Sequence, residues 1–417
     1  MFLKTNYSLH SILLLGGPFL FSAAAFSLSL ATQQSVSARD FGLYAFAQVM
    51  VGFGQAFSNA MFGSPLVVAL VKGGQDFEEV EASFGSSNFI FVIVATLVLL
   101  VTAGGLGYSP LTTAALALWA VLSWTRWYFR CVALANNHRR AASISDVVSA
   151  VCTLALVAVL IGSGLLFLPT ALLVMAASSA VGIIALSRFA IRYARSLRKA
   201  SFRLFLRHFG QHGRWALLGV TSTEVVSNFH AYIITILVGP AAFAPIALAT
   251  LLFRPVGVVL AALTQFERPQ LASAVKSRNL GHLMSLIKHF RILALIGWFG
   301  NLLSILLLVI FVPQFFDEGG YEGSVVMLAL CLMAGVTLLR SVRSPDSAVL
   351  QAAGSFRSLA MSSIIVSPIT MMIVAAIVVF NSNLVVWSMV GILVGETVFA
   401  VLVRRQLGSL QKEIKHG

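Results

Sequence analysis

The chain has 417 residues, of which 59% are hydrophobic and only 10% are charged. This balance excludes an ordinary soluble globular domain and predicts an integral membrane protein. In a soluble protein the formal net charge of +14 would suggest nucleic acid binding, but here the basic residues gather between apolar runs. The positive-inside rule explains that placement, so we expect no nucleic acid partner.

Twelve apolar runs are long enough to cross the hydrocarbon core of a bilayer, which takes about 20 helical residues each. They are residues 12–31, 43–71, 86–106, 111–130, 147–167, 169–187, 215–237, 241–263, 292–312, 324–343, 359–380 and 384–403. We therefore predict an all-α, polytopic membrane protein with about twelve transmembrane helices in two six-helix bundles. The first run is too long for the core of a signal peptide, and we interpret it as an uncleaved helix.

A basic segment without acidic residues separates the two groups of apolar runs. Arg195, Lys199, Arg203 and Arg207 recur in it at every fourth position, which is typical of a basic amphipathic helix on an anionic leaflet. The predicted domains are a six-helix bundle at 1–187, a basic cytoplasmic connector at 188–214, and a second six-helix bundle with a short tail at 215–417.

The loops after even-numbered helices collect almost every Lys and Arg, so both termini are predicted to be cytoplasmic, in a multi-pass protein of the inner membrane. One loop on that side is an exception, because it carries Asp76, Glu78, Glu79 and Glu81. Acidic residues contribute little to the rule, so the predicted topology is unchanged.

The two halves of the chain resemble each other. Val36 to Gln48 aligns without gaps to Val238 to Thr250, which places the second predicted helix on the eighth. Both helices run in the same direction, so the repeat is parallel and predicts two bundles related by a pseudo-twofold axis along the membrane normal. A substrate path between the bundles is expected from that arrangement.

Arg254 is the deepest ionisable residue of the predicted spans, roughly 20 Å from the outer end of its helix at 1.5 Å per residue. A charge near the bilayer centre costs roughly 2.5 to 3.5 kcal/mol on insertion scales, which makes such a residue a candidate for function. A guanidinium can hold phosphate oxygens in a bidentate manner. The alternative is an arginine that snorkels inwards. Through the repeat, Arg254 corresponds to a polar stripe of the second helix that contains Gln48, Gln55 and Asn59.

Three further positions complete the candidate set. On the seventh helix, Glu224 and Asn228 share a polar face, and Glu224 is a candidate to pair with Arg254 or to bind a proton or cation. The alternative is a hydrogen-bonding contact between helices. Arg126 is a candidate to extend a basic cavity, or else an interfacial anchor. Glu396 lies within two turns of the end of its predicted span and is interpreted as structural.

Several chemistries are missing from the sequence. It has no phosphate-binding glycine loop, no zinc-protease motif, and no segment large enough for a soluble ATPase domain. The scattered Cys131, Cys152 and Cys331 suggest neither a disulfide framework nor a metal site. We expect no catalytic residue, no metal and no cofactor, with coupling to H⁺ or Na⁺ left open. The longest outer loop, residues 313–323, is too short for a membrane polymerase or ligase.

The segments Ala38 to Gln48, Gly63-Ser-Pro-Leu-Val-Val-Ala-Leu-Val-Lys72 and Phe266-Glu-Arg-Pro-Gln-Leu271 carry a family resemblance. Together with the helix count, the six-plus-six division and the basic connector, they resemble the Wzx-type polysaccharide flippases, which export O-antigen and exopolysaccharide units. That family belongs to the multidrug/oligosaccharidyl-lipid/polysaccharide exporter superfamily. The resemblance implies a V-shaped pair of bundles whose central, often cationic cavity is lined by helices 1, 2, 7 and 8.

The resemblance implies a flippase that moves a polyprenyl-diphosphate-linked oligosaccharide to the periplasmic leaflet by alternating access, for surface polysaccharide biosynthesis. Arg254 would then hold phosphate, with Arg126 at the edge, and Glu224 would be the coupling candidate. Four amides, those of Gln48, Gln55, Asn59 and Asn228, would meet sugar hydroxyls. Partners implied are the lipid-linked oligosaccharide, membrane lipids, a polysaccharide polymerase and a chain-length regulator. The alternatives are a cation-coupled multidrug antiporter of the same superfamily and, ranked lower, a membrane polymerase or ligase.

Overall fold

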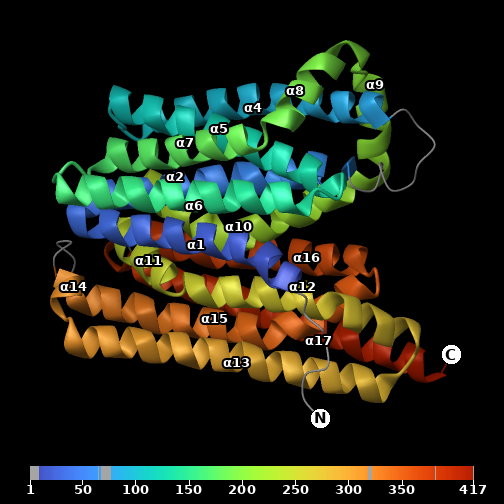
Figure 1. Cartoon of the computed structure of the whole chain (residues 1–417). Helices are drawn as coiled ribbons and strands as arrows, with labels where there is room; N and C mark the ends of the chain where they lie inside the picture. The colour runs from blue at the N-terminus through green and yellow to red at the C-terminus, as the bar shows by residue number, and fades with distance from the viewer. Residues whose placement is uncertain (1–8, 64, 67–76, 318–321, 381, 417) are drawn as a thin grey trace. The chain divides into compact units, whose positions relative to one another are not determined.

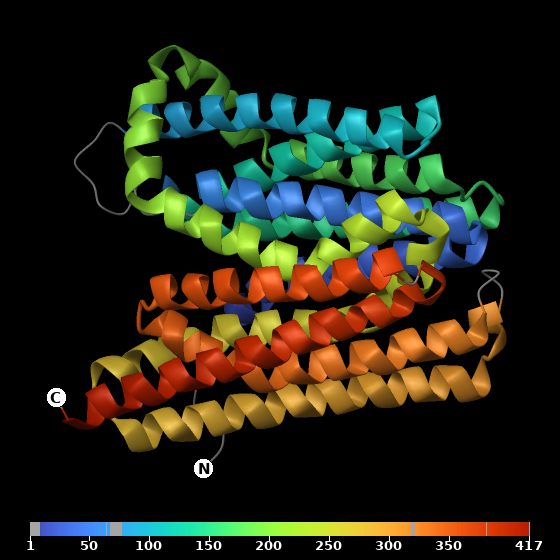
Figure 2. The same cartoon turned by 180° about the vertical axis from the view of Figure 1, so that it is seen from behind.

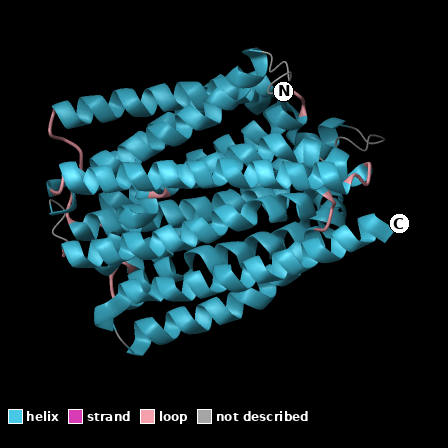
Figure 3. Ribbon diagram, turned by 90° about the horizontal axis from the view of Figure 1, so that it is seen from below, coloured by secondary structure: helices cyan, strands magenta, loops and turns pink. Residues whose placement is uncertain are grey.

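The computed structural model describes residues 9–63, 65–66, 77–317, 322–380 and 382–416 (Figure 1). Within these residues the regular structure is helical and contains no strand, as Figure 3 shows. Most of the segment from Gly63 to Lys72 lies outside the described residues, as do Asp76 and Glu318.

The first half of the chain forms α1 (Leu9–Ser35), α2 (Ala38–Ser58), η1 (Asn59–Gly63), α4 (Phe77–Gly105), α5 (Pro110–Ala135), α6 (Arg139–Gly162), α7 (Leu168–Ala185), α8 (Ser187–Ser196), η2 (Leu197–Lys199), α9 (Phe202–His208) and η3 (Phe209–Gly213). The second half forms α10 (Arg214–Leu237), α11 (Pro240–Leu252), α12 (Arg254–Lys276), α13 (Leu280–Phe311), α14 (Gln314–Asp317), α15 (Gly323–Ala352), α16 (Phe356–Phe380), η4 (Ser382–Trp387) and α17 (Ser388–His416).

The predicted spans fall on helices of the structure. Span 43–71 covers α2 and η1 and ends outside the described residues, span 241–263 covers α11 and the start of α12, and span 384–403 covers η4 and part of α17. In the described part of the chain, seven helices are long and apolar enough to cross a membrane, and the bent pair makes up to eight. Their outward side chains are apolar, with Val101 79% and Phe380 88% exposed, as a lipid-facing surface requires. The predicted all-helical membrane fold is confirmed.

The chain divides into two compact units, one of residues 1–36 and 43–220 and the other of residues 37–42 and 221–417. Inside the first unit, α5 packs on α7, α6 on α7 and α4 on α5; inside the second, α15 packs on α17, α16 on α17 and α13 on α15. These three packed pairs occur at corresponding places in the two halves, and this supports the internal repeat. The predicted domain limits at residues 187 and 215 stay a prediction.

Local sequence explains where the repeat-related helices α2 and α11 begin. They start at Ala38 and Pro240, which are aligned positions of the repeat. Before α11, Gly239 has φ 116°, a backbone conformation that residues other than glycine rarely adopt. Proline then suits the first helical turn, where its missing N–H removes no hydrogen bond.

The connector between the two groups of spans packs on α4. Arg192 of α8 binds Glu81 at 2.6 Å, and Lys199 of η2 binds Glu78 at 2.5 Å. Both carboxylates lie in the first turns of α4, in the acidic segment that was the exception to the positive-inside rule. The structure therefore explains that exception, since at least two of its acids are counter-charges for basic residues of the connector.

Close packing of α5, α6 and α7 leads to a stability prediction at Gly182. A methyl group added there would collide with Nε of Arg126 and Oγ of Ser149. We expect Gly182→Ala to lower the free energy of unfolding by about 1–3 kcal/mol through overpacking. Thermal unfolding of the purified protein in detergent measures this. The matched control is Gly300→Ala in α13, where a methyl group meets nothing within 4 Å and helix propensity favours alanine. An equal loss at both positions would contradict the packing argument.

Candidate functional site

In the first unit, one buried carboxylate binds two arginines. Asp146 of α6 accepts hydrogen bonds from Arg126 at 2.6 Å and Arg130 at 3.0 Å, both from α5. The side chains of Arg126 and Asp146 are only 8% and 4% exposed. Nε of Arg126 also donates to Oγ of Ser145 at 3.1 Å, and its guanidinium lies 4.4 Å from the ring centre of Phe21. The pair is therefore enclosed by protein on several sides.

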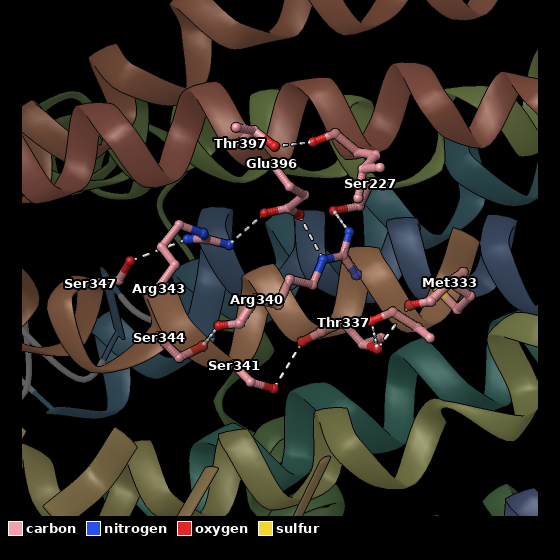
Figure 4. Close-up of polar contacts among 12 residues, drawn as sticks. Ser227, Met333, Thr337, Arg340, Ser341, Arg343, Ser344, Ser347, Glu396 and Thr397 are labelled. Atoms are coloured by element: carbon pink, nitrogen blue, oxygen red, sulfur yellow. Dashed lines mark hydrogen bonds and ion pairs between the residues drawn. The ribbon is translucent and has the colours of Figure 1, made fainter. Parts of the chain in front are cut away.

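The second unit repeats this motif at a different carboxylate (Figure 4). Glu396 of α17, whose side chain is 3% exposed, binds Nε of Arg340 at 2.6 Å and Nη2 of Arg343 at 3.1 Å. Both arginines come from α15, which occupies the place of α5 in the repeat. In each unit two arginines thus share one acid.

The two arginines on Glu396 differ in accessibility. Arg343 is 16% exposed; it donates to Ser347 at 3.2 Å and stacks 4.3 Å from the ring centre of Phe399. Arg340 is 31% exposed, and its Nη2 reaches Ser227 of α10 at 3.4 Å. Arg340 is therefore the cation of this cluster that a ligand can approach.

Glu224 lies on α10, one turn before Asn228, which donates a hydrogen bond to its carboxylate at 2.7 Å. The predicted pairing of Glu224 with Arg254 stays a prediction. The charge of Arg340 acts on Glu224, and Ser227, three residues further along α10, accepts a hydrogen bond from the same arginine. Glu224, Asn228 and Arg340 thus belong to one polar region inside the second unit.

Arg254 is the first residue of α12, at the point where the span breaks and bends by 44°. Pro255 explains the break, because it lacks the N–H that would continue the hydrogen bonding of α11. The side chain of Arg254 is half-buried. One turn further on, Gly257 is exposed, and a methyl group added there would meet nothing within 4 Å. A broken span with an arginine at the start of its second half favours anions, since the helix N-terminus adds partial positive charge.

The residues of the predicted polar stripe of the first half lie on α2 and on the π-helix that follows it. Gln48 and Gln55 are half-buried on α2, and exposed Gly52 lies between them. Nε2 of Gln48 donates to Oγ of Ser29 on α1 at 2.8 Å. Asn59 lies on η1, beyond the end of α2, and its Oδ1 faces Sγ of Cys131 at 3.9 Å. Asn59 therefore lies past the point where the α-helix changes to a π-helix.

The substrate-binding roles of these residues stay predictions. The same holds for Arg126, whose guanidinium forms an ion pair with Asp146. No pattern in the sequence singled out Asp146, Arg340 or Arg343. Glu396, predicted to lie within two turns of the end of its span, lies inside α17, which continues to His416. The only sequence feature that pointed to these ion pairs was the presence of charged residues at the ends of apolar runs. Ordinary loops between membrane spans carry charges at the same places. Among the described residues, no cluster of His, Cys, Asp or Glu is arranged to hold a metal ion.

A further buried ion pair joins α13 to α15. Nη2 of Arg291 on α13 binds Asp346 on α15 at 2.6 Å, and the Asp346 side chain is 6% exposed. Three carboxylates, those of Asp146, Asp346 and Glu396, are therefore each neutralised by arginines from a neighbouring helix. Such cross-helix pairs let charged residues lie inside membrane bundles.

No family model matches the chain, and the search of curated proteins found no match. Among solved structures, the chain is similar to the inward-facing conformation of a multidrug resistance MATE family transporter of the MOP superfamily. The TM-score is 0.68 at 16% identity, over 96% of this chain and 99% of that one. It is equally similar to the lipid II flippase MurJ in its inward closed conformation, with TM-score 0.68 and 13% identity over 97% and 90%.

A MOP superfamily transporter from Pyrococcus furiosus also matches, with TM-score 0.56 and 16% identity over 96% of this chain and 95% of that one. Identities this low establish the fold alone. These structures are transporters or flippases, and they cover nearly the full length of the chain. The chain therefore has a MATE-like transporter fold built of two helical bundles.

Proposed function

We propose that the protein is a flippase that moves a polyprenyl-diphosphate-linked oligosaccharide from the cytoplasmic to the periplasmic leaflet of the inner membrane, by alternating access. The observation that carries the proposal is the excess of cationic groups within the spans. In each unit two arginines share one buried acid, and Arg254 begins α12 at the break between α11 and α12. A diphosphate is the chemistry that such groups recognise best.

Similarity to MurJ, a lipid II flippase, supports a lipid-linked substrate. In this proposal Arg254 binds phosphate, and the amides of Gln48, Gln55, Asn59 and Asn228 bind sugar hydroxyls. Glu224 is the proposed coupling residue, for H⁺ or Na⁺. The proposed biological role is surface polysaccharide biosynthesis, and a polysaccharide polymerase and a chain-length regulator are its proposed partners.

The second candidate is a cation-coupled multidrug antiporter. It is favoured by the similarity to multidrug transporters of the MATE family and by the half-buried acid Glu224 on the polar face of α10. A carboxylate inside a span is a common proton or cation site in transporters. The arginines near it argue against a cationic drug, because like charges repel at short range.

A reconstitution experiment separates the two functions. The purified chain is placed in liposomes that carry undecaprenyl-diphosphate linked to a fluorescently labelled oligosaccharide, and a membrane-impermeant quencher reports the outer leaflet. Without the protein, only the labelled lipid of the outer leaflet is quenched. With the protein, we expect the labelled lipid of both leaflets to be quenched. The matched control lipid has the same tail and sugar without phosphate. Release of an entrapped cationic dye under a pH or Na⁺ gradient, without flipping of either lipid, would reject the flippase in favour of the antiporter.

A further inference from the structure

The connector helices α8 and α9 have two faces of different chemistry. Their inner face packs on α4, as described above. Their outer face, here called the connector outer face, consists of Ile191, Arg195, Phe202, Arg203, Leu206 and Arg207, all of which are exposed. None of the residues from 188 to 214 is acidic, so the connector cannot neutralise this face by itself.

Charges on the inner face are already paired. Arg192 is bound to Glu81, whose side chain is 2% exposed, and Lys199 is bound to Glu78. The backbone N–H of Ser201 donates to Oγ of Ser83 at 2.9 Å, which fixes the start of α9 on α4. The acidic residues of α4 thus bind the inward-facing Arg192 and Lys199.

Apolar packing fixes the rotation of α9. Phe205 is 4% exposed and packs against Phe62 and Phe84, with ring centres 5.4 Å from each. With Phe205 turned inwards, the side chains on either side of it must face outwards. Phe202 is 59% exposed and Leu206 48% exposed, one turn apart on the helix.

The outward side of α9 therefore combines two stripes. Phe202 and Leu206 form an apolar stripe, and the following residues, Arg203 and Arg207, form a basic stripe beside it. Within the described part of the chain, neither of these arginines forms an ion pair. Exposed aromatic and aliphatic side chains next to unpaired arginines are typical of a helix that lies in the interface of a membrane.

The position of the connector agrees with that chemistry. It follows α7 after one residue and leads through η3 directly into α10, so it lies at the ends of spanning helices. Figures 1 and 2 show α9 running across the direction of α4, as a helix in the plane of a membrane does when α4 spans it. A bilayer surface is thus the nearest large partner available to this face.

We propose that the connector outer face binds anionic phospholipids at the membrane surface. Arg195, Arg203 and Arg207 contact lipid phosphates, while Phe202 and Leu206 enter the boundary between headgroups and acyl chains. The apolar stripe distinguishes this surface from a nucleic acid site, where a basic stripe would suffice. The inference is independent of the transported substrate, because it uses no residue of the proposed transport site.

The test is hydrogen–deuterium exchange of the full-length protein in nanodiscs. One set contains phosphatidylcholine alone, and the other contains phosphatidylcholine mixed with anionic phosphatidylglycerol. We expect the amides of α9 to exchange more slowly in the anionic nanodiscs. Each arginine contributes about fivefold to the preference for anionic lipid, which corresponds to about 1 kcal/mol. The preference for anionic lipid should therefore fall about thirtyfold in the variant R203Q/R207Q. High salt should weaken the slowing of exchange because it screens the charges.

The matched control is K276Q/R278Q, which removes the same charge from the exposed end of α12 and the turn after it. It should keep the lipid dependence of α9. In F202S/L206S the arginines remain, and we expect the lipid dependence to weaken without being lost. Equal exchange of wild-type α9 in the two nanodiscs would overturn the proposal. So would a lipid dependence that R203Q/R207Q retains, or full protection of α9 in detergent without lipid, which would assign the face to packing within the protein.

Discussion

Glu396→Gln is expected to lower the stability of the protein by about 3–5 kcal/mol, because it leaves two arginines inside the second unit without their common counter-charge. Glu396 is 3% exposed, and both Arg340 and Arg343 depend on it. Glutamine has nearly the same shape, so the effect comes from charge rather than from a cavity. The measurement is the midpoint of thermal unfolding of the purified protein, together with the yield of monodisperse protein in detergent.

Two further variants make this result specific. Glu413→Gln changes the same side chain on the same helix at an exposed position, and it should leave the midpoint unchanged. The double variant R343M/E396Q removes one of the two uncompensated arginines, so part of the stability should return. A double-mutant cycle over Arg343 and Glu396 should give a clear coupling energy. If the two effects simply add, the ion pair does not hold α15 and α17 together.

For the proposed flippase, Arg254→Ala is expected to abolish export of the glycan while the protein still inserts and folds. The expected loss is about 2–5 kcal/mol of interaction with the phosphate, the range for removing one partner of a buried, hydrogen-bonded charge pair. That loss corresponds to about thirtyfold or more in transport rate. Surface polysaccharide in cells and lipid flipping in liposomes both measure it.

Arg254→Lys refines the test, because lysine keeps the charge but loses the planar fork that binds two oxygens. We expect intermediate activity in that variant. Lys276→Ala is the matched control, since Lys276 is an exposed cation on the same helix, α12. Normal polysaccharide export in Arg254→Ala would reject Arg254 as the phosphate ligand. Loss of export in Lys276→Ala as well would point to the overall charge of the helix instead.

The sequence by itself determined the helical membrane fold. A span needs about 20 apolar residues whatever its neighbours are, so each long apolar run identified its helix without any knowledge of packing. The gapless match of Val36–Gln48 with Val238–Thr250 indicated the repeat, and three helix pairs pack at corresponding places in the two units. Arg254 stood out for the same reason, because its depth depends only on its place along one helix.

Tertiary structure alone decided which charges are compensated. Glu396 and Arg340 are 56 positions apart in sequence and come together at 2.6 Å, so no local pattern could pair them. A charged residue near the end of an apolar run can lie in a loop at the surface, or it can lie inside the bundle and be neutralised by an ion pair. Composition cannot separate these, because the free energy of burying a charge is set by its partner, and the partner lies on another helix.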